Sequence, residues 1–137
     1  MDDVSNFSIN YKLIRKPKHK TENILAFSAT FSICIDNKLF LKIDDFAILD
    51  FAIKIYKWYN ENEKEFVYIP MDDDNEILKI EIFNDCFYLI TSNWSEYNDM
   101  YIKKECVHEA VDDFIELFKN EFEKLGGNFL KEVKKYI

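Results

Sequence analysis

The residues that could perform nucleophilic catalysis are few in this chain. Such catalysis needs a histidine or another base beside a serine or cysteine, and the chain has two histidines, His19 and His108. His19 stands among lysines, and His108 stands next to the apolar Val107. Glycine-rich phosphate loops and the Gly-x-Ser-x-Gly motif are absent from a sequence with two glycines in all. We expect both histidines to be solvated or to lie at the edge of the core.

Carboxylates are the other groups in the sequence that could do chemistry. The densest cluster contains Asp72, Asp73, Asp74 and Glu76. A calcium-binding loop needs alternating acidic residues, a central glycine and a distal glutamate, and this segment has no such order. We expect a solvated turn that holds neither a metal nor a cofactor. A small enzyme that uses paired carboxylates, alone or with a metal, stays open as an alternative.

The cysteines and the N-terminus bear on the cellular compartment. Cys34, Cys86 and Cys106 are odd in number and widely spaced, and none has a Cys-x-x-Cys partner or a histidine at zinc-site spacing. Such cysteines fit a reducing compartment. The acidic start, residues 1–4, has no apolar signal core, and no apolar run approaches the roughly 20 residues of a membrane helix. We expect a cytoplasmic protein that does not span a membrane.

The segment Trp94–Asp99, which follows the predicted strand Cys86–Ser92, combines large aromatic and acidic side chains. Tryptophan and tyrosine dominate the binding energy of many protein interfaces. The same rings can also fold back over the edge of the core, and the sequence leaves both interpretations open. We select eight acidic and aromatic residues as candidates for partner binding: Asp72, Asp73, Asp74, Glu76, Trp94, Glu96, Tyr97 and Asp99.

The charge balance indicates which class of partner this surface would attract. The chain carries 26 acidic and 18 basic residues, for a net charge of −8. A negative field repels nucleic acids and anionic lipids, whereas it accelerates the approach of a basic protein. We expect the short basic segment Arg15–Lys20 to form a solvated loop. We therefore expect a basic protein partner, with no nucleic acid and no membrane.

The elements that must position these residues follow from apolar periodicity. The helices are expected at Phe46–Tyr59, with Asp44 and Asp45 as N-cap residues, at Lys104–Leu125, and at Phe129–Tyr136 after the Gly126–Gly127 cap. Alternation predicts six strands, and a further short one is open at Met100–Lys103: Phe7–Ile14, Asn23–Ile35, Leu39–Ile43, Glu65–Ile69, Ile77–Phe83 and Cys86–Ser92.

The pattern predicts an α+β fold in a single domain, residues 1–137. A hydrophobic fraction of 48% is ample for one core and excludes a mainly disordered chain. Short connections favour antiparallel pairing, and each clear strand has one apolar and one polar face. We expect a two-layer sandwich in which an antiparallel sheet of about six strands, in the order β-β-β-α-β-β-β-α-α, has helices packed on one face. The broad apolar surface of Phe46–Tyr59 predicts a helix buried on more than one side.

The whole pattern resembles a class of small acidic bacterial proteins. The resemblance is carried by Phe7-x-Ile9-x-Tyr11, by Trp58 in a helix, by the Ser92-x-Trp94 step and by the final amphipathic helix. Some members of that class are immunity proteins of contact-dependent or polymorphic toxin systems. The resemblance implies a cytoplasmic protein that binds and neutralises a toxin domain. Many such toxins are basic nucleases, which an acidic antidote would match.

The leading hypothesis is therefore a non-enzymatic binding module that occludes a basic toxin domain. The small carboxylate-dependent or metal-dependent enzyme is the first alternative, and a deep pocket lined by carboxylates would favour it. A protein that self-associates, for example as a homodimer, through a sheet edge or a wet sheet face is the second alternative. The face that carries Ser28, Thr30 and Ser32 is a further candidate surface.

Overall fold

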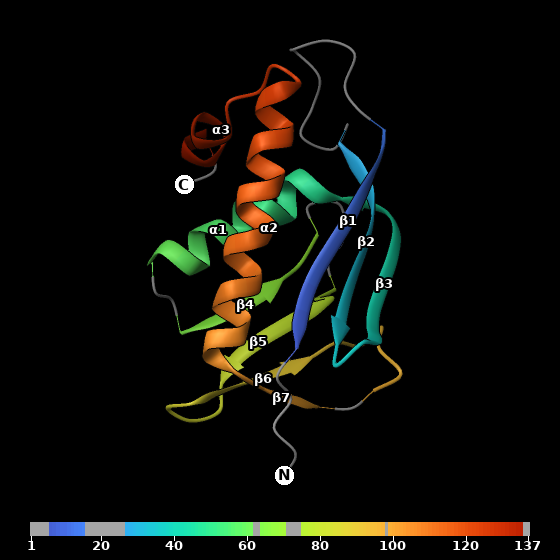
Figure 1. Cartoon of the computed structure of the whole chain (residues 1–137), viewed down its shortest axis with the longest axis vertical. Coiled ribbons are helices and arrows are strands. Elements are labelled where there is room, and N and C mark those ends of the chain that lie inside the picture. Colours follow the sequence, from blue (N-terminus) through green and yellow to red (C-terminus); the bar gives the residue numbers. More distant parts are fainter. Residues whose placement is uncertain (1–5, 16–26, 62–63, 71–74, 98, 136–137) are drawn as a thin grey trace.

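Seven strands and three helices form the described part of the chain. The computed structural model describes residues 6–15, 27–61, 64–70, 75–97 and 99–135. Figure 1 shows these elements in their chain order: β1 (Phe7–Arg15), β2 (Ser28–Ile35), β3 (Lys38–Ala47), α1 (Ile48–Glu61), β4 (Glu65–Tyr68), β5 (Leu78–Ile82), β6 (Phe87–Thr91), β7 (Met100–Lys103), α2 (Lys104–Lys124) and α3 (Phe129–Lys135).

The first sheet is antiparallel, in the order β1-β2-β3. Its tight turn uses Asp36 and Asn37, whose φ angles of 52° and 64° lie in the left-handed region that these two residue types tolerate. The turn lies between the predicted strands Asn23–Ile35 and Leu39–Ile43, where the chain must reverse to pair them. The register sets Tyr11 opposite Phe31, and the apolar alternation of β2 faces the core.

The second sheet is also antiparallel, in the order β4-β5-β6-β7. The turn between β5 and β6 is held by Asn84, whose Oδ1 accepts hydrogen bonds from the backbone N–H groups of Cys86 and Phe87 at 2.8 and 2.9 Å. On the inner side, Ile80 pairs with Phe66 on one side and with Ile90 on the other, and all three are buried.

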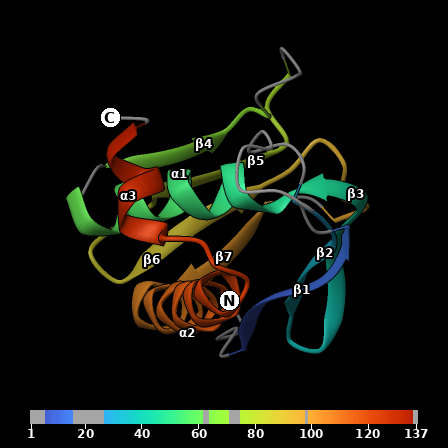
Figure 2. The ribbon, with the colours of Figure 1, turned by 90° about the horizontal axis from the view of Figure 1, so that it is seen from above.

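The expected single sheet of about six strands is wrong. Hairpin turns determine pairing within each run of strands, but they do not determine whether two runs join edge to edge. The helix α1 separates β3 from β4 in the sequence, and it contacts both β2 and β4 in space. The helix α2 contacts β1 of the first sheet and β6 and β7 of the second, so the helices pack against two sheets rather than on one face of one sheet (Figures 1 and 2).

The helix α1 begins later than the sequence predicts. Asp44 and Asp45 lie in β3 and do not cap the helix, because the strand continues to Ala47 while Phe46 stacks on Phe31 at 4.2 Å between ring centroids. The prediction that this helix is buried on more than one side is confirmed. Its first six residues, 48–53, are all buried, and six consecutive helical positions cover every side of the helix.

The helix α2 spans nearly the predicted range, and its apolar stripe faces the core. Leu117 and Leu125 recur at the spacing of this stripe, but they are exposed by 60% and 44%. Leu117 lies at the margin of the stripe, and Leu125 lies beyond the last helical residue. The buried residues of the helix are Val107, Ala110, Val111, Phe114, Ile115, Phe118 and Phe122.

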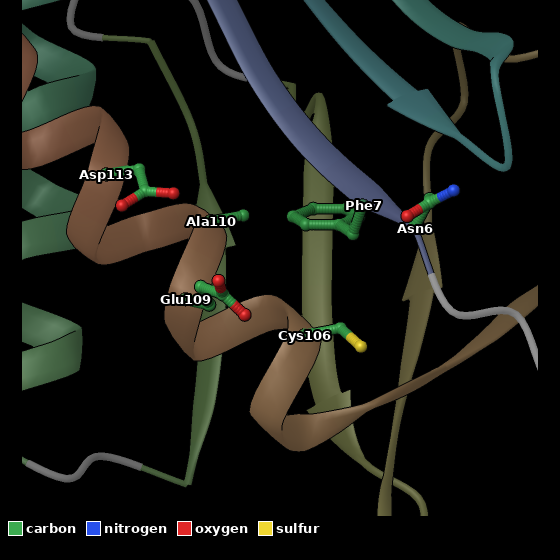
Figure 3. A pocket seen from close by; sticks show the side chains of 6 residues that line it. All are labelled: Asn6, Phe7, Cys106, Glu109, Ala110 and Asp113. Carbon is green, nitrogen blue, oxygen red and sulfur yellow. The ribbon is translucent and has the colours of Figure 1, made fainter.

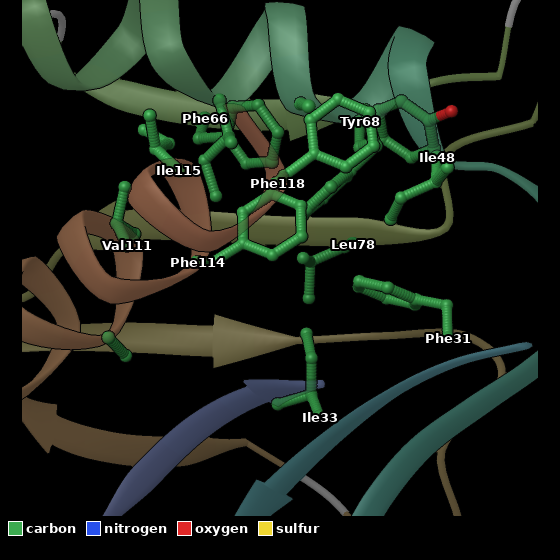
Figure 4. Packing of buried hydrophobic residues seen from close by; sticks show 14 of the residues in the cluster. Phe31, Ile33, Ile48, Phe66, Tyr68, Leu78, Val111, Phe114, Ile115 and Phe118 are labelled. Carbon is green, nitrogen blue, oxygen red and sulfur yellow. The ribbon is translucent and has the colours of Figure 1, made fainter. Parts of the chain in front are cut away.

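One cluster of buried residues connects every described element. Phe51 of α1 lies at its centre, with its ring in contact with Phe31 of β2, Tyr68 of β4 and Phe114 of α2 at centroid distances of 4.8, 5.2 and 5.6 Å. Figure 4 shows side chains from the helices and from both sheets converging on this centre. The two sheets and the helices therefore share their core.

Within the described residues, none of the helices combines the length and the apolar character that crossing a membrane would require.

Candidate functional site

The connection between β6 and β7 contains the aromatic and acidic residues selected from the sequence. Two serines shape its backbone: the N–H of Trp94 donates to Ser92 Oγ and the N–H of Tyr97 donates to Ser95 Oγ, each at 3.1 Å. The N–H of Ser95 also donates to the carbonyl of Ser92 at 3.3 Å. These local bonds hold consecutive tight turns without using the side chains of Trp94 and Tyr97.

The two aromatic side chains of this loop point into solvent. Trp94 is 55% exposed and Tyr97 is 41% exposed, and Glu96 and Asp99 are exposed as well. Neither aromatic residue belongs to the buried cluster. The structure therefore does not fold these two rings back over the edge of the core; whether they bind a partner stays a prediction. We call Trp94, Glu96, Tyr97 and Asp99 the aromatic-acidic loop.

The acidic turn before β5 divides between described and undescribed residues. Glu76 is exposed, whereas Asp72, Asp73 and Asp74 lie outside the described residues. Because β5 and β6 are antiparallel and Lys79 pairs with Thr91, the start of β5 and the end of β6 lie at the same end of the sheet. The register therefore brings Glu76 to the end of the second sheet that carries the aromatic-acidic loop.

A buried carboxylate fastens the same end of the sheet to α1. Asp50 is 2% exposed, and its Oδ2 accepts hydrogen bonds from the Tyr68 hydroxyl at 2.9 Å and from Lys54 Nζ at 3.2 Å. Lys54 Nζ also donates to the carbonyl of Ile69 at 2.9 Å. A buried charge persists when it is paired and hydrogen-bonded in this way. The contacts of Asp50 and Lys54 therefore link α1 to the end of β4.

A small cavity opens between the start of β1 and the first turns of α2 (Figure 3). Its volume is about 170 Å³, and its lining includes Asn6, Cys106, Glu109 and Asp113. Burial, reinforced by the negative charge of Glu105, raises the pKa of the Cys106 thiol. A thiol that resists ionisation is a poor nucleophile, so this cavity is not built for thiolate chemistry.

A group of titratable side chains lies on another side of α2. The Tyr88 hydroxyl and His108 Nε2 are hydrogen-bonded at 2.6 Å, and the Tyr59 hydroxyl donates to Asp112 Oδ2 at 2.7 Å. Lys104 lies over the Tyr88 ring at 5.4 Å from the centroid. These contacts join α1, β6 and α2, and we call Tyr59, Tyr88, Lys104, His108 and Asp112 the tyrosine-histidine cluster.

Each shifted pKa in this cluster favours the neutral form of its group. Burial, with a smaller effect from the positive charge of Lys104, lowers the pKa of His108. Burial raises the pKa of Tyr88. The hydrogen bond to Asp112 is the main cause that raises the pKa of Tyr59. The Tyr88 hydroxyl is paired with His108 Nε2, and the Tyr59 hydroxyl is paired with Asp112. Such pairing is typical of a structural polar contact between elements.

His108 lies at the edge of the core, which is one of the two places expected for it. It is half-buried and hydrogen-bonded. The spacing of Lys104, His108 and Asp112 at four-residue intervals was a visible signal that they share one side of a helix. No sequence signal pointed to Tyr59 and Tyr88, which come from other elements.

The described residues show no arrangement suited to a metal ion: they contain no group of three or more His, Cys, Asp or Glu side chains that could hold one. His19 and the rest of the basic segment after Arg15 lie outside the described residues.

Comparison with known proteins places the chain in a family. Searches of the curated proteins and of the solved structures gave no match. A family model does match residues 5–124, a range that includes both sheets, α1, α2, the aromatic-acidic loop and the tyrosine-histidine cluster. The chain therefore belongs to the family described as a domain of unknown function (DUF7878).

Proposed function

We propose that this chain is a non-enzymatic protein-binding module, an immunity or antitoxin-like protein of the cytoplasm, which occludes a basic toxin domain. The binding surface is the end of the second sheet that carries the aromatic-acidic loop and Glu76. The observation that carries the proposal is the exposure of Trp94 by 55% on a loop whose backbone is fixed by its own serines.

The exposed aromatic side chains support binding because the loop is already in shape. A large ring that is held out in solvent by a fixed backbone loses little conformational entropy when a partner covers it. Trp94 and Tyr97 are two such rings, and they are the residue types most often found at the energetic centre of an interface. They would slow the dissociation of the complex.

The charge of the loop supports a basic partner. Glu76, Glu96 and Asp99 are exposed at the same end of the sheet, in a chain with a net charge of −8. Exposed carboxylates around an aromatic centre steer a positively charged protein and raise its association rate. Such a complex would cover the groove with which a basic toxin holds its substrate.

The chemistry of the other clusters favours binding over catalysis. The Tyr88 hydroxyl and His108 Nε2 are hydrogen-bonded to each other, and burial raises the pKa of Cys106. The cavity beside Cys106, with a volume of about 170 Å³, is small compared with the roughly 300–1,000 Å³ of ordinary ligand pockets. These features support the binding module against the carboxylate-dependent enzyme.

The proposal is tested by replacing Trp94 with alanine and measuring affinity. The binding partner to be tested is a basic toxin domain, if a neighbouring gene encodes one, with its catalytic activity removed, and the method is titration calorimetry at two salt concentrations. We expect Trp94→Ala to weaken binding by about 2 kcal/mol, roughly thirty-fold in Kd, while the circular dichroism spectrum is unchanged. High salt should weaken the wild-type complex.

Leu117→Ala provides the matched control, because Leu117 is as exposed as Trp94 but lies on α2. Its affinity should equal that of the wild type. Equal affinities of the wild type and Trp94→Ala would refute the assignment of the loop. Absence of binding to any basic domain encoded beside this gene would refute the proposed function.

A further inference from the structure

The last helix, α3, lies on a small aromatic surface formed by the two longer helices. Phe129 and Val133, one helical turn apart, are its buried side chains. The Phe129 ring meets Tyr56 of α1 edge to face at 5.4 Å between centroids, and it meets Phe118 of α2 at 6.1 Å. We call Tyr56 and Phe118 the α3 seat. Leu130, the residue that follows Phe129, is 43% exposed.

The polar contacts that the structure gives α3 stay within its own segment. Asn128 Oδ1 accepts a hydrogen bond from the N–H of Lys131 at 3.1 Å, which caps the start of the helix. Lys135 Nζ lies 3.3 Å from Glu132 Oε1 on the same helix. The contact with the α3 seat is therefore made by apolar side chains. Apolar attraction is not directional, so another helix with the same apolar spacing meets the same physical requirement.

A pair of glycines joins α3 to the end of α2. Gly126 has a φ of 93°, in the left-handed region, and its N–H donates to the carbonyl of Glu123 at 3.0 Å. Gly127 lies so close to Phe122 that a Cβ atom there would come within 2.4 Å of the ring. Glycine is the residue with the widest backbone freedom, so this joint allows α3 to swing away while α2 keeps its place.

The balance of energies leaves α3 weakly held. A helix of seven residues is too short to persist in water by itself, and two of its side chains are buried. The family match ends at residue 124, the last residue of α2, so α3 lies beyond the matched part of the chain. Terminal elements with few buried contacts open separately from the core of a protein. These features predict that α3 is released and docked again while the two sheets stay folded.

The charge of α3 is opposite to that of the protein on which it packs. The helix carries three lysines and one glutamate, in a chain whose net charge is −8. It is therefore a basic amphipathic helix on an acidic protein, and opposite charges favour such an encounter. The occupant of the α3 seat shows which ligand chemistry the seat accepts, namely large apolar side chains four residues apart on a lysine-rich helix.

We infer that the α3 seat is a docking site for a basic amphipathic helix of a partner protein, and that α3 occupies it until the partner displaces it. Apolar anchors at four-residue spacing are a recurrent mode of helix recognition. Because α3 is tethered, its effective concentration at the seat is high, and a partner binds only the molecules in which α3 is released. The helix is thus a built-in competitor that sets how strong a partner must be.

This site is separate from the proposed toxin-binding surface and does not rest on it. Figures 1 and 2 show α3 far from the connection between β6 and β7, which carries the aromatic-acidic loop. A partner could therefore be held at either place without covering the other.

The first test is hydrogen exchange of the wild-type chain, followed amide by amide. We expect the amides of Glu132–Lys135 to exchange about 100-fold or more faster than those of Phe114 and Phe118 in the middle of α2. Equal protection of the two helices would overturn the inference, because α3 would then open only when the whole protein unfolds. This measurement needs no variant.

The second test asks whether the α3 seat accepts a helix that is not tethered. The probe is a fluorescein-labelled peptide with the sequence of residues 126–137, titrated into the full chain and followed by fluorescence anisotropy. In Phe129→Glu the chain's own helix cannot dock, because it would bury an unpaired carboxylate. The seat is then free, and we expect this variant to bind the peptide about ten-fold or more tightly than the wild type does.

Leu130→Glu is the matched control, because it adds the same charge at the adjacent exposed position and leaves α3 docked. Its affinity for the peptide should equal that of the wild type. If circular dichroism shows that Phe129→Glu is unfolded, Val133→Glu takes its place.

Two altered peptides test the ligand chemistry. A peptide with alanine at both apolar anchor positions should not bind Phe129→Glu. A peptide in which glutamate replaces the three lysines should bind it about ten-fold more weakly at low salt, with a smaller difference at high salt. Equal binding of the lysine and glutamate peptides would refute the basic character of the partner.

Two further results would overturn the inference. Phe129→Glu could bind the peptide no more tightly than Leu130→Glu does, which would mean that the seat holds a helix only through its tether. Wild-type dimers in sedimentation velocity that Phe129→Glu abolishes would assign the seat to α3 of a second copy instead. The Trp94→Ala experiment is scored on a toxin domain, so its failure is distinguishable from these results.

Discussion

The two sheets of this protein have the same kind of inner face and different outer faces. Inside, both contribute large apolar side chains to one core. Outside, the second sheet carries Phe83, Phe87, Leu89 and Tyr101 beside Lys79 and Glu81. The outer side of the first sheet has mainly small polar groups and lysines, namely Ser8, Asn10, Lys12, Thr30, Ser32 and Lys42, with the exposed Ile14 and Leu39 near its ends. The inner faces are constrained by packing, so it is the outer faces that are free to differ with function.

The first sheet also shows how an irregular register modifies a simple alternation. Ser28 was expected on the polar face with Thr30 and Ser32, but it is 3% exposed. The pairing shifts beside it, between Leu13 and Arg15 on one side and between Ala29 and Phe31 on the other. A bulge breaks the strict alternation of faces, and the sequence alone does not reveal one.

The largest effect that separates inner from outer positions is expected at Phe51. Its ring contacts β2, β4 and α2, so Phe51→Ala should cost about 3–5 kcal/mol of unfolding free energy and destabilise both sheets together. Urea unfolding followed by circular dichroism measures the loss. Phe83→Ala is the control, because the same truncation at a half-exposed outer position should cost far less. Equal losses would mean that the sheets do not depend on this shared centre.

Most of the fold was predictable because it rests on local signals. The left-handed turn at Asp36–Asn37, the hairpin at Asn84 and the long amphipathic stripe of α2 each follow from residue types at short range. The separation into two sheets was not predictable in this way, because it depends on where α1 packs. The burial of Asp50 was hidden for the same reason, since its partner Tyr68 lies 18 residues away.

The candidate site shows a similar division. Sequence composition selected Trp94, Glu96, Tyr97 and Asp99, but the orientation of the rings needed the structure. Asp72, Asp73 and Asp74 stay a prediction, because they lie outside the described residues. The contact between Phe83 and Tyr101 on the outer side of the second sheet was missed because the two rings come from different parts of the chain, and an apolar residue in a strand gives no sign of which side will be covered.

A smaller effect on the unfolding free energy should come from the polar contact that each sheet makes with α2. The first sheet uses Tyr11, whose hydroxyl donates to Glu121 Oε2 at 3.1 Å, and the second uses the hydrogen bond between Tyr88 and His108. The folded pKa of His108 lies below its usual value of 6.5, so the unfolded chain takes up this proton first as the pH falls. The unfolding free energy should therefore decrease from about pH 6.5 downward and be unaffected above it.

His108→Gln should flatten this acid dependence, whereas Tyr11→Phe should leave it as steep as in the wild type. Urea unfolding between pH 5 and pH 8 measures both slopes. Lys104, Asp112, Tyr59 and Tyr88 all face His108, and only the histidine has a usual pKa inside the range where the slope should change. Parallel curves for the wild type and His108→Gln would show that the dependence comes from other groups.

The smallest effect is expected on the outer face of the first sheet, and it sharpens the contrast most directly. Ser32→Ala removes a half-buried hydroxyl from a surface strand position, and such changes usually alter stability by less than about 0.5 kcal/mol. Urea unfolding followed by circular dichroism measures the change. A loss as large as that of Phe51→Ala would show that this outer position is packed as tightly as the shared core.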